Sequence, residues 1–245
     1  MTTESSSTHV ECRPAWAPMT ADKGTLTALH LRGPVPYLPM WQRQQALATA
    51  RVRGEIGDQL LLLEHPHVYT NGRHGDRRHL LADETTLARI GAAYHEVDRG
   101  GDITYHGPGQ LVGYPIVSLE QLGVGVRTYV RGLETAIIHT AAHFGVEATA
   151  EPGYTGVWVG RDKLAAIGVR VTRGVAFHGF ALNVAPDLSY FNQIVPCGIP
   201  DRGVTSLGQL CGRSISVAEV VPICAAALAE VLGLKLTALE MVDAI

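Results

Sequence analysis

The sequence predicts an α+β fold, a single domain in which a mixed β-sheet is backed by helices. Strand-type and helix-type runs are interleaved, but they lack the regular strand–helix–strand repeat of a doubly wound fold. Apolar residues make up 46% of the 245 positions, which is enough for a sizeable core. After a polar start there is no linker, repeat or low-complexity segment. We therefore expect a disordered tail at residues 1–24 and one domain at residues 25–245.

The spacing of apolar residues predicts the individual elements. Strands are expected at residues 25–32, 60–65, 156–160, 163–171 and 175–184, where apolar residues alternate with polar ones or form short runs. Helices are expected at residues 38–53, 83–91 and 126–144. A last helix opens at Ser216, which is spaced to form a capping box with Glu219. Pro222 inside that helix should kink or delay it.

Composition and charge exclude several classes of protein. The formal net charge is −3 and charged residues make up 18% of the chain, so nucleic acid or an anionic membrane would find no basic footprint. No apolar run approaches the roughly 20 residues that span a bilayer, and the N-terminus lacks a secretory signal. The four cysteines lack CxxC spacing and the eleven histidines lack the spacing of a zinc motif. We therefore expect reduced thiols in the cytoplasm and no metal.

One cysteine differs from the others in its surroundings. Cys197 lies between Pro196 and Gly198, in a loop sequence that cannot form regular helix, and the glycine lets a substrate approach the backbone. Cys224 falls on the apolar stripe of the last helix and Cys211 follows two leucines, so both are expected to pack in the core. Cys197 is therefore the candidate nucleophile.

A nucleophilic cysteine reacts as its thiolate, which a nearby cation stabilises. The candidate cations in strand-type segments are Lys163, Arg170, His178 and His106. Lys163 precedes an apolar run, so it is either a solvated turn residue or a lysine drawn out of water where a buried strand begins. In the second case desolvation would lower its pKa and let it exchange a proton with a thiol. The residue pattern alone leaves this choice open.

A glycine-rich stretch lies between Arg99 and Gln110. It begins RGG and continues TYHGPGQ from Thr104, which is neither a GxGxxG fingerprint nor a Walker sequence. A tight hairpin is one explanation. The tyrosine, histidine and glutamine between the glycines favour another, a backbone wall around a ligand carbonyl, phosphate or thioester.

Four long segments resemble one family, the lipoyl(octanoyl) transferases. They are RGGDITYHGPGQLVGYPIVSL at 99–119, GVWVGRDKLAAIGVRV at 156–171, HGFALNV at 178–184 and IVPCGIPDRGVTSL at 194–207. The match extends from about residue 26 to about residue 232 in the same order. The resemblance implies a fold similar to that of the biotin and lipoate protein ligases. It also implies that an octanoyl group moves from an acyl carrier protein to a lysine of a lipoyl domain.

The resemblance also implies a role for individual residues. The nucleophile falls on Cys197 and its activating lysine on Lys163. The implied walls of the acyl pocket are Arg99, Gly100, Gly101, Asp102, Ile103, Thr104, Tyr105 and His106, then Ala166, Ile167 and Gly168, and finally Gly179, Phe180 and Ala181. Because a carrier-protein thioester is already activated, neither ATP nor a metal is expected.

The implied partners are proteins. Acyl carrier protein would donate the octanoyl group, and lipoyl domains of 2-oxoacid dehydrogenase E2 subunits and the glycine cleavage H protein would accept it. No nucleic acid or membrane partner is expected, and the expected state is a monomer. Small acidic domains would need a local basic surface, for which Arg73, Arg77 and Arg78 are the candidates.

Three other functions remain open at this point. An ATP-dependent lipoate or biotin ligase would form an acyl-adenylate and need no cysteine nucleophile. A non-catalytic acyl- or carrier-binding protein would need neither Cys197 nor Lys163. A cysteine hydrolase would combine Cys197 with His178 or His106, and water would accept the acyl group.

Overall fold

A computed structural model of the chain describes residues 24–195 and 202–243. Within these residues the main sheet has nine strands. Their order is β12 (Lys235–Asp243), β1 (Thr25–Pro34), β2 (Asp58–Glu64), β6 (Gln110–Ser118), β10 (Val175–Asn183), β9 (Asp162–Thr172), β8 (Tyr154–Val159) and β7 (Thr149–Glu151), with β11 (Gly203–Val204) paired to β9. A second sheet consists of β4 (Ala93–Glu96), β3 (Val68–Asn71) and β5 (Thr104–His106).

The main sheet is mixed, as the sequence predicts. β1 lies parallel to β12 and β2, and β11 lies parallel to β9, whereas the neighbours from β2 to β7 run antiparallel. The β9–β10 hairpin turns at Arg173 and Gly174, whose φ angles are 48° and 79°. Positive φ at both central residues is the geometry of a two-residue turn that matches the twist of the flanking strands.

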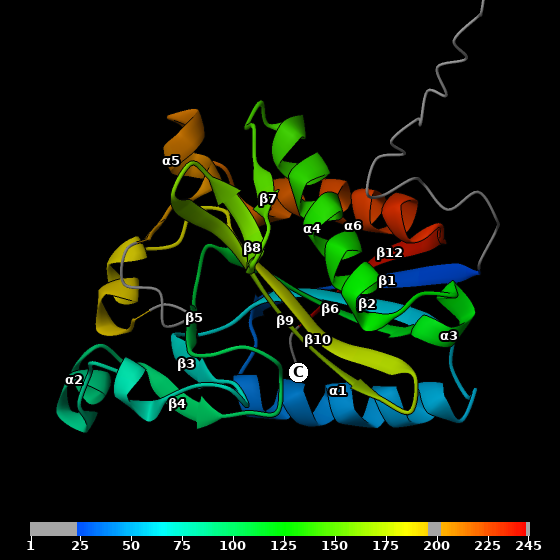
Figure 1. Ribbon diagram of the computed structural model, residues 1–245, viewed down its shortest axis with the longest axis horizontal. Coiled ribbons are helices and arrows are strands. Elements are labelled where there is room, and N and C mark those ends of the chain that lie inside the picture. The colour runs from blue at the N-terminus through cyan, green and yellow to red at the C-terminus, as the bar shows by residue number, and fades with distance from the viewer. Residues whose placement is uncertain (1–23, 196–201, 244–245) are drawn as a thin grey trace, which may run out of the picture.

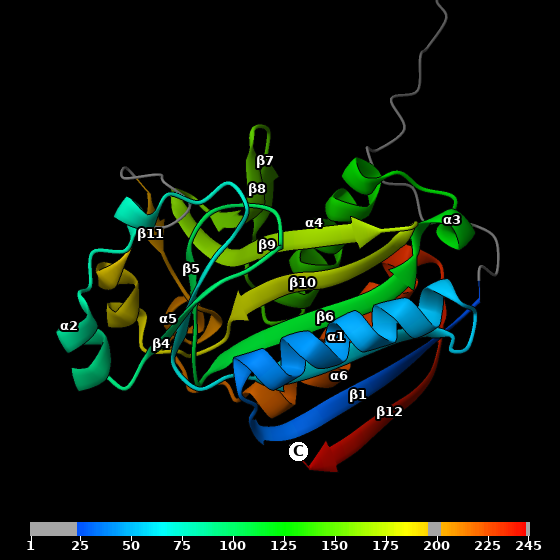
Figure 2. The same cartoon turned by 90° about the horizontal axis from the view of Figure 1, so that it is seen from below.

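Helices cover both faces of the main sheet (Figures 1 and 2). α1 (Tyr37–Val52) packs on β6 and β10 on one face, while α4 (Val126–His143) and α6 (Val217–Leu232) lie against each other on the opposite face. The shorter elements are α2 (Glu84–Arg89), α3 (Leu119–Leu122), α5 (Leu207–Cys211) and the 3₁₀ turns η1 (Arg77–His79) and η2 (Leu188–Gln193). Among the described residues, no helix is long and apolar enough to cross a membrane.

The predicted core roles of two cysteines are confirmed. Cys224 is fully buried in the largest apolar cluster, between the main sheet and the helices α4 and α6, and burial raises its pKa to about 12. Cys211 is half-buried against the same cluster, and its thiol donates to the Phe144 carbonyl at 3.4 Å. Neither thiol is therefore set up as a nucleophile.

Helix ends follow the sequence closely, with one exception. Asp83 caps α2 by accepting from the Thr86 amide at 2.7 Å. Ser216 and Glu219 form the predicted capping box. The expected delay of α6 by Pro222 is wrong, because the helix begins at Val217, directly after its cap. The capping box secures the first turn, so the proline removes only one later hydrogen bond.

A buried ion pair joins the end of α1 to the start of β2. Arg51 Nε donates to Asp58 Oδ1 at 2.7 Å, and both side chains are less than 10% exposed. The same carboxylate oxygen accepts from the Ser118 amide at 3.0 Å, at the end of β6. Three elements therefore meet at one carboxylate.

Removing this carboxylate should be far more costly than removing an exposed one. Asp58→Ala leaves the Arg51 guanidinium buried without its partner, and the free energy of unfolding should fall by about 3–5 kcal/mol. The matched control is Asp243→Ala, because Arg32 and Asp243 also pair at 2.7 Å but are 56% and 83% exposed. That change should cost no more than about 1 kcal/mol. Urea unfolding measures both variants, and equal losses would contradict the role of burial.

Candidate active site

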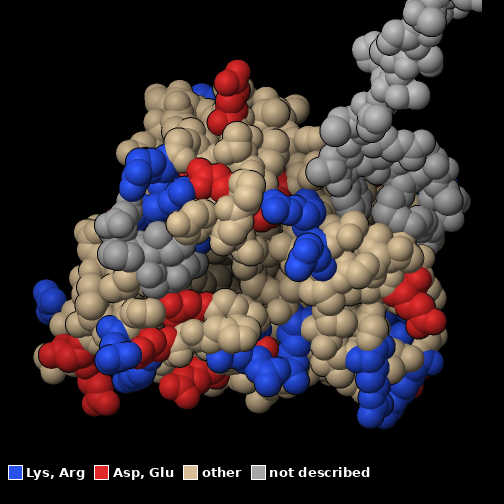
Figure 3. Space-filling model, in the orientation of Figure 1, with Lys and Arg blue, Asp and Glu red and all other residues tan. Residues whose placement is uncertain are grey.

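A narrow slot runs between the glycine-rich loop and the β9–β10 hairpin. Its longer part has a cavity volume of about 50 Å³ and is lined by Tyr37, Arg99, Gly101, Asp102, Thr104, His106, Val112, Tyr114, Ala166, Ile167, Gly168, His178, Gly179, Phe180 and Ala181. Its shorter part, of about 10 Å³, is lined by Thr104, Gln110, Lys163, Ala166, Ala181, Asn183, Phe191 and Val204. The two parts share three lining residues, and we call them together the central slot. Figure 3 shows this face hollowed near its centre, with basic side chains on both sides of the hollow.

The antiparallel register of β9 and β10 makes room for the slot. Ala166 lies opposite Ala181, and Gly168 lies opposite Gly179. A side chain at Gly168 would place its Cβ 2.7 Å from the Gly100 carbonyl oxygen. The glycine therefore lets the loop backbone lie directly on the strand, where the Gly100 amide donates to the Val169 carbonyl at 2.9 Å.

Polar contacts of two loop residues, one buried and one partly buried, hold the loop in place. Arg99 Nη2 donates to the Thr70 carbonyl at 2.5 Å and to the Thr70 hydroxyl at 2.9 Å. Asp102 Oδ2 accepts from His79 at 2.6 Å, and Asp102 Oδ1 accepts from the Ile103 and Asp76 amides. The predicted wall residues Gly100, Ile103 and Tyr105 do not line the slot. Ile103 and Tyr105 are fully buried in the cluster beneath it, so they support the wall.

A chain of buried hydrogen bonds runs along the slot. His106 Nδ1 lies 2.8 Å from Gln110 Oε1, and Gln110 Nε2 donates to Asn183 Oδ1 at 2.9 Å. Asn183 Nδ2 then donates to the Thr205 carbonyl at 3.0 Å. Burial lowers the pKa of His106 to about 3, so its ring is neutral and donates from Nδ1 to the glutamine. The sequence analysis noted Gln110 as part of the glycine-rich stretch but not Asn183, whose role appears only through this series of hydrogen bonds.

Lys163 lies at the end of this series of hydrogen bonds, where its carbonyl accepts from the Thr205 amide at 3.1 Å. The residue is buried, with a relative exposure of 7%. It belongs to β9, where it pairs with Trp158 of β8 on one side and Val204 of β11 on the other. Its Nζ lies 4.7 Å from the centre of the Trp158 ring. Of the two readings left open by the sequence, the structure supports the lysine at the start of a buried strand.

The other candidate cations are not placed like Lys163. His178 pairs with Val169, six residues along β9 from Lys163, which is about 20 Å at the rise of an antiparallel strand. Desolvation lowers the pKa of His178 as it does that of His106. Arg170 pairs with Asp98 at 3.2 Å, outside the slot lining.

Cys197 lies outside the described residues, as do its neighbours from 196 to 201. The chain is described again from Arg202, whose guanidinium lies 4.3 Å from the centre of the Tyr154 ring and 4.7 Å from that of Trp158. Gly203 and Val204 then pair with Asp162 and Lys163. The segment that follows the candidate nucleophile thus returns to the lysine strand.

Two of the arginines proposed as a docking surface for acidic partners make contacts of their own. Of the candidate docking cluster, Arg78 is paired with its neighbour Asp76 at 2.5 Å and Arg77 lies 4.1 Å above the Tyr94 ring. The ion pair with Asp76 offsets the charge of Arg78, whereas the contact with the Tyr94 ring leaves that of Arg77 in place.

Over the described part of the chain, no group of three or more His, Cys, Asp or Glu side chains is arranged to hold a metal ion.

Comparison with solved structures gives the class of fold. An archaeal bi-partite lipoate protein ligase from Thermoplasma acidophilum matches with a TM-score of 0.67 and 17% identity, over 91% of this chain and 88% of that one. A lipoate-protein ligase A bound with ATP matches with a TM-score of 0.67 and 16% identity, over 89% of each chain. At such identities the likeness concerns the fold alone, which is that of the lipoate protein ligases.

Sequence comparison gives the family. The model of the lipoyl protein ligase A/B catalytic domain matches residues 36–229, and the chain belongs to this family. An octanoyltransferase of Solibacter usitatus is 53% identical over 188 residues, which cover 77% of this chain and 84% of that protein. An octanoyltransferase of Chloroflexus aggregans is 48% identical over 214 residues, 86% of this chain and 96% of that protein.

The hydrogen-bond chain of the slot should contribute measurably to stability. Gln110→Ala leaves His106 Nδ1–H and Asn183 Oδ1 buried without partners, so the free energy of unfolding should fall by about 2–4 kcal/mol. Gln42→Ala, on the exposed side of α1, is the control and should change it by less than about 0.5 kcal/mol. Chemical denaturation with a tyrosine or tryptophan signal gives both values. If Gln110→Ala lowers the free energy of unfolding no more than Gln42→Ala does, these hydrogen bonds do not stabilise the fold.

Proposed function

We propose that this protein is an octanoyltransferase that moves an octanoyl group from an acyl carrier protein to a lysine of a lipoyl domain, through a thioester on Cys197. The observation that carries the proposal is the buried position of Lys163 in the slot. This lysine lies at one end of a slot walled by alanine and glycine, in a chain about half identical to octanoyltransferases. Lys235, the other described lysine, is exposed.

The chemistry requires a group that takes and returns protons, which is the role we assign to Lys163. Its amine accepts the Cys197 thiol proton, and the thiolate attacks the carbonyl carbon of the donor thioester. The carrier thiol leaves with a proton, and one thioester replaces another at little net cost. The acceptor lysine then attacks the Cys197 thioester, its proton passes to Lys163, and the Cys197 thiol is restored. The amide is the more stable product, so this second step drives the cycle.

The acyl chain would occupy the central slot. Ala166, Gly168, Gly179 and Ala181 give small or absent side chains along β9 and β10, and Ile167 and Phe180 add apolar surface. On the opposite side the loop contributes Arg99, Gly101, Asp102, Thr104 and His106. A cavity of about 50 Å³ is smaller than an acyl chain needs, so side chains must move apart when the substrate enters.

Cofactor, partner and domain assignments belong to the same proposal. The donor arrives activated and the sequence has no phosphate-binding motif, so neither ATP nor a metal should be required. Acyl carrier protein is the proposed donor, and lipoyl domains of 2-oxoacid dehydrogenases and the glycine cleavage H protein are the proposed acceptors. Residues 25–245 would form the catalytic domain. The predicted tail at residues 1–24 lies almost entirely outside the described residues. We also propose, from the sequence alone, that the protein is a monomer in the cytoplasm.

The intermediate can be observed directly. Mixing the protein with octanoyl-acyl carrier protein, in EDTA and without ATP, should add one octanoyl group to the chain, and hydroxylamine should remove it. Cys211→Ala and Cys224→Ala should still acquire the adduct, because those thiols pack in the core, whereas Cys197→Ala should not. Intact-protein mass spectrometry measures this. An adduct on another residue would end the mechanism, and a strict need for ATP and magnesium would favour the ligase alternative.

The proton-transfer role of Lys163 makes a second prediction. Lys163→Ala should lose acyl transfer on the order of 10²–10⁴-fold, as expected for a missing general base. Lys163→Arg should not restore it, because a guanidinium keeps its proton. Lys235→Ala is the control and should transfer at the parental rate. Steady-state transfer to a lipoyl domain gives the three values. Near-parental turnover of Lys163→Arg would show that a fixed positive charge suffices.

A further inference from the structure

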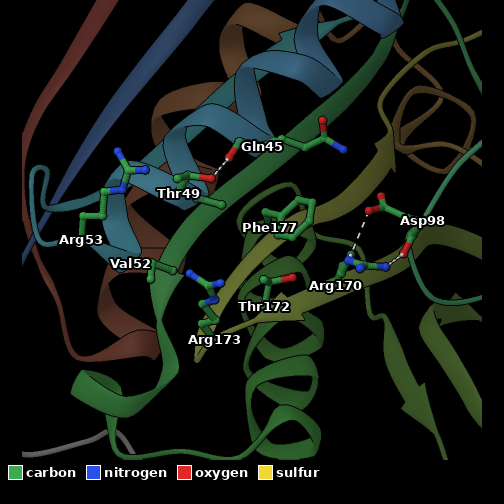
Figure 4. A pocket seen from close by; sticks show the side chains of 10 residues that line it. Gln45, Thr49, Val52, Arg53, Asp98, Arg170, Thr172, Arg173 and Phe177 are labelled. Atoms are coloured by element: carbon green, nitrogen blue, oxygen red, sulfur yellow. Dashed lines mark hydrogen bonds and ion pairs between the residues drawn. The ribbon is translucent and has the colours of Figure 1, made fainter.

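A second cavity adjoins the central slot, because neighbouring residues of the same chain segments line one or the other. This outer groove has a volume of about 440 Å³ and is lined by Gln45, Ala48, Thr49, Val52, Arg53, Asp98, Arg170, Thr172, Arg173 and Phe177 (Figure 4). Three chain segments change from one cavity to the other within one or two residues. In each segment one residue lines the groove and a near neighbour lines the slot. The pairs, with the groove residue first, are Asp98 and Arg99, Phe177 and His178, and Arg170 and Gly168.

His178 forms the wall between the two cavities. Its side chain is 1% exposed and lines the slot, while Nε2 lies 2.8 Å from Asp98 Oδ1 on the groove side. Asp98 is itself held by Trp41 Nε1 at 3.0 Å and by Arg170 Nε at 3.2 Å. Figure 4 shows the Asp98–Arg170 pair at the edge of the groove. The ring is therefore anchored from behind by a carboxylate that keeps two other partners.

The backbone also departs from its usual conformation to place this ring. His178 has φ = 54° in the middle of β10, and its amide donates to Gln44 Oε1 at 3.0 Å. Non-glycine residues adopt such φ values rarely, and the conformation persists only where the surroundings fix it. Of the non-glycine residues that the structure describes, only Arg173 shares this feature.

His178 lies at the end of the slot away from Lys163. Going along the paired strands from Lys163, the slot passes Ala166 and Ala181, then Gly168 and Gly179, and reaches His178 opposite Val169. An acyl chain bound by its thioester near Lys163 would therefore point its methyl end towards the His178 ring.

We propose that the His178 ring sets the longest acyl chain that the enzyme accepts, by closing the far end of the slot against the outer groove. The inference rests on the proposed octanoyl transfer. Without the ring, the slot opens into a cavity whose floor includes the buried apolar residues Ala48 and Phe177. Longer chains could then extend into it, and each further buried methylene is worth roughly a factor of four in binding.

The test compares kcat/KM for octanoyl-, decanoyl- and dodecanoyl-acyl carrier protein with one lipoyl domain. His178→Gly removes the ring and suits the positive φ, so the backbone need not move. We expect it to raise the ratio of kcat/KM for decanoyl over octanoyl donors on the order of tenfold, from two added methylenes. The dodecanoyl ratio should rise further.

Arg173→Gly is the matched control. It replaces the other non-glycine residue at positive φ, in the same hairpin, and removes a long side chain from the groove without opening the wall. Its chain-length profile should equal that of the parent. His178→Asn is a second test variant, because asparagine tolerates positive φ and is shorter than histidine.

Each outcome decides one question. If the parent transfers octanoyl but His178→Gly and His178→Asn keep the parental profile, the wall assignment is wrong. If both variants fail to fold by circular dichroism and thermal unfolding, the ring supports the fold and is not a wall, which also overturns the proposal. If Arg173→Gly shifts the profile equally, the effect comes from the hairpin. A parent that transfers no octanoyl group refutes the proposed function instead.

Discussion

The slot depends on one close approach between two backbones. The Gly100 segment lies on β9 because Gly168 has no side chain, and the Gly100 amide donates to the Val169 carbonyl. Arg99 then reaches Thr70 of the second sheet, and Asp102 reaches His79. A loop joined to both sheets in this way forms a wall, which Ile103 and Tyr105 also support by packing into a small apolar cluster beneath it. Any side chain at residue 168 would lift this wall off the strand.

Neutral histidines allow the slot to be polar on one side and apolar on the other. Burial lowers the pKa of His65 to about 4 and that of His106 to about 3, so neither brings a charge near an acyl chain. His65 lies 2.7 Å from the Tyr114 hydroxyl, and His106 lies 2.8 Å from Gln110. With their polar atoms paired in this way, His106 and Tyr114 present ring surfaces to the slot, and His65 lies behind them. The apolar surface comes from β9 and β10.

The sequence predicted most of the fold because its signals are local. The capping residues Asp83 and Ser216 and the strand-type runs depend on neighbours within a few positions. β12 escaped prediction because it is an edge strand, in which exposed and half-buried residues mix without clear alternation. It is recognisable only through its pairing with β1, more than 200 residues earlier.

The sequence predicted those slot residues that lie together in one motif. It did not predict those that distant segments bring to the slot. The family resemblance implied that Ala166 to Gly168 and Gly179 to Ala181 are pocket walls, and they line the slot because the two segments pair as adjacent strands. Tyr37 and Tyr114 also line it, yet they come from α1 and β6, and no spacing in the sequence brings them together. The burial of Lys163 likewise depends on Trp158 and on the return of the chain at Val204.

The pairing of β1 with β12 has a consequence for how the chain folds. One edge of β1 is covered only by β12, which is synthesised more than 200 residues after it. Until then Leu26 and Ala28, which are fully buried in the folded protein, lie on a strand with an unpaired edge. Such edges recruit other strands, and contacts between distant segments form slowly. During synthesis this edge therefore stays open to aggregation until β12 follows, and chaperones that shield it would have their greatest effect in that interval.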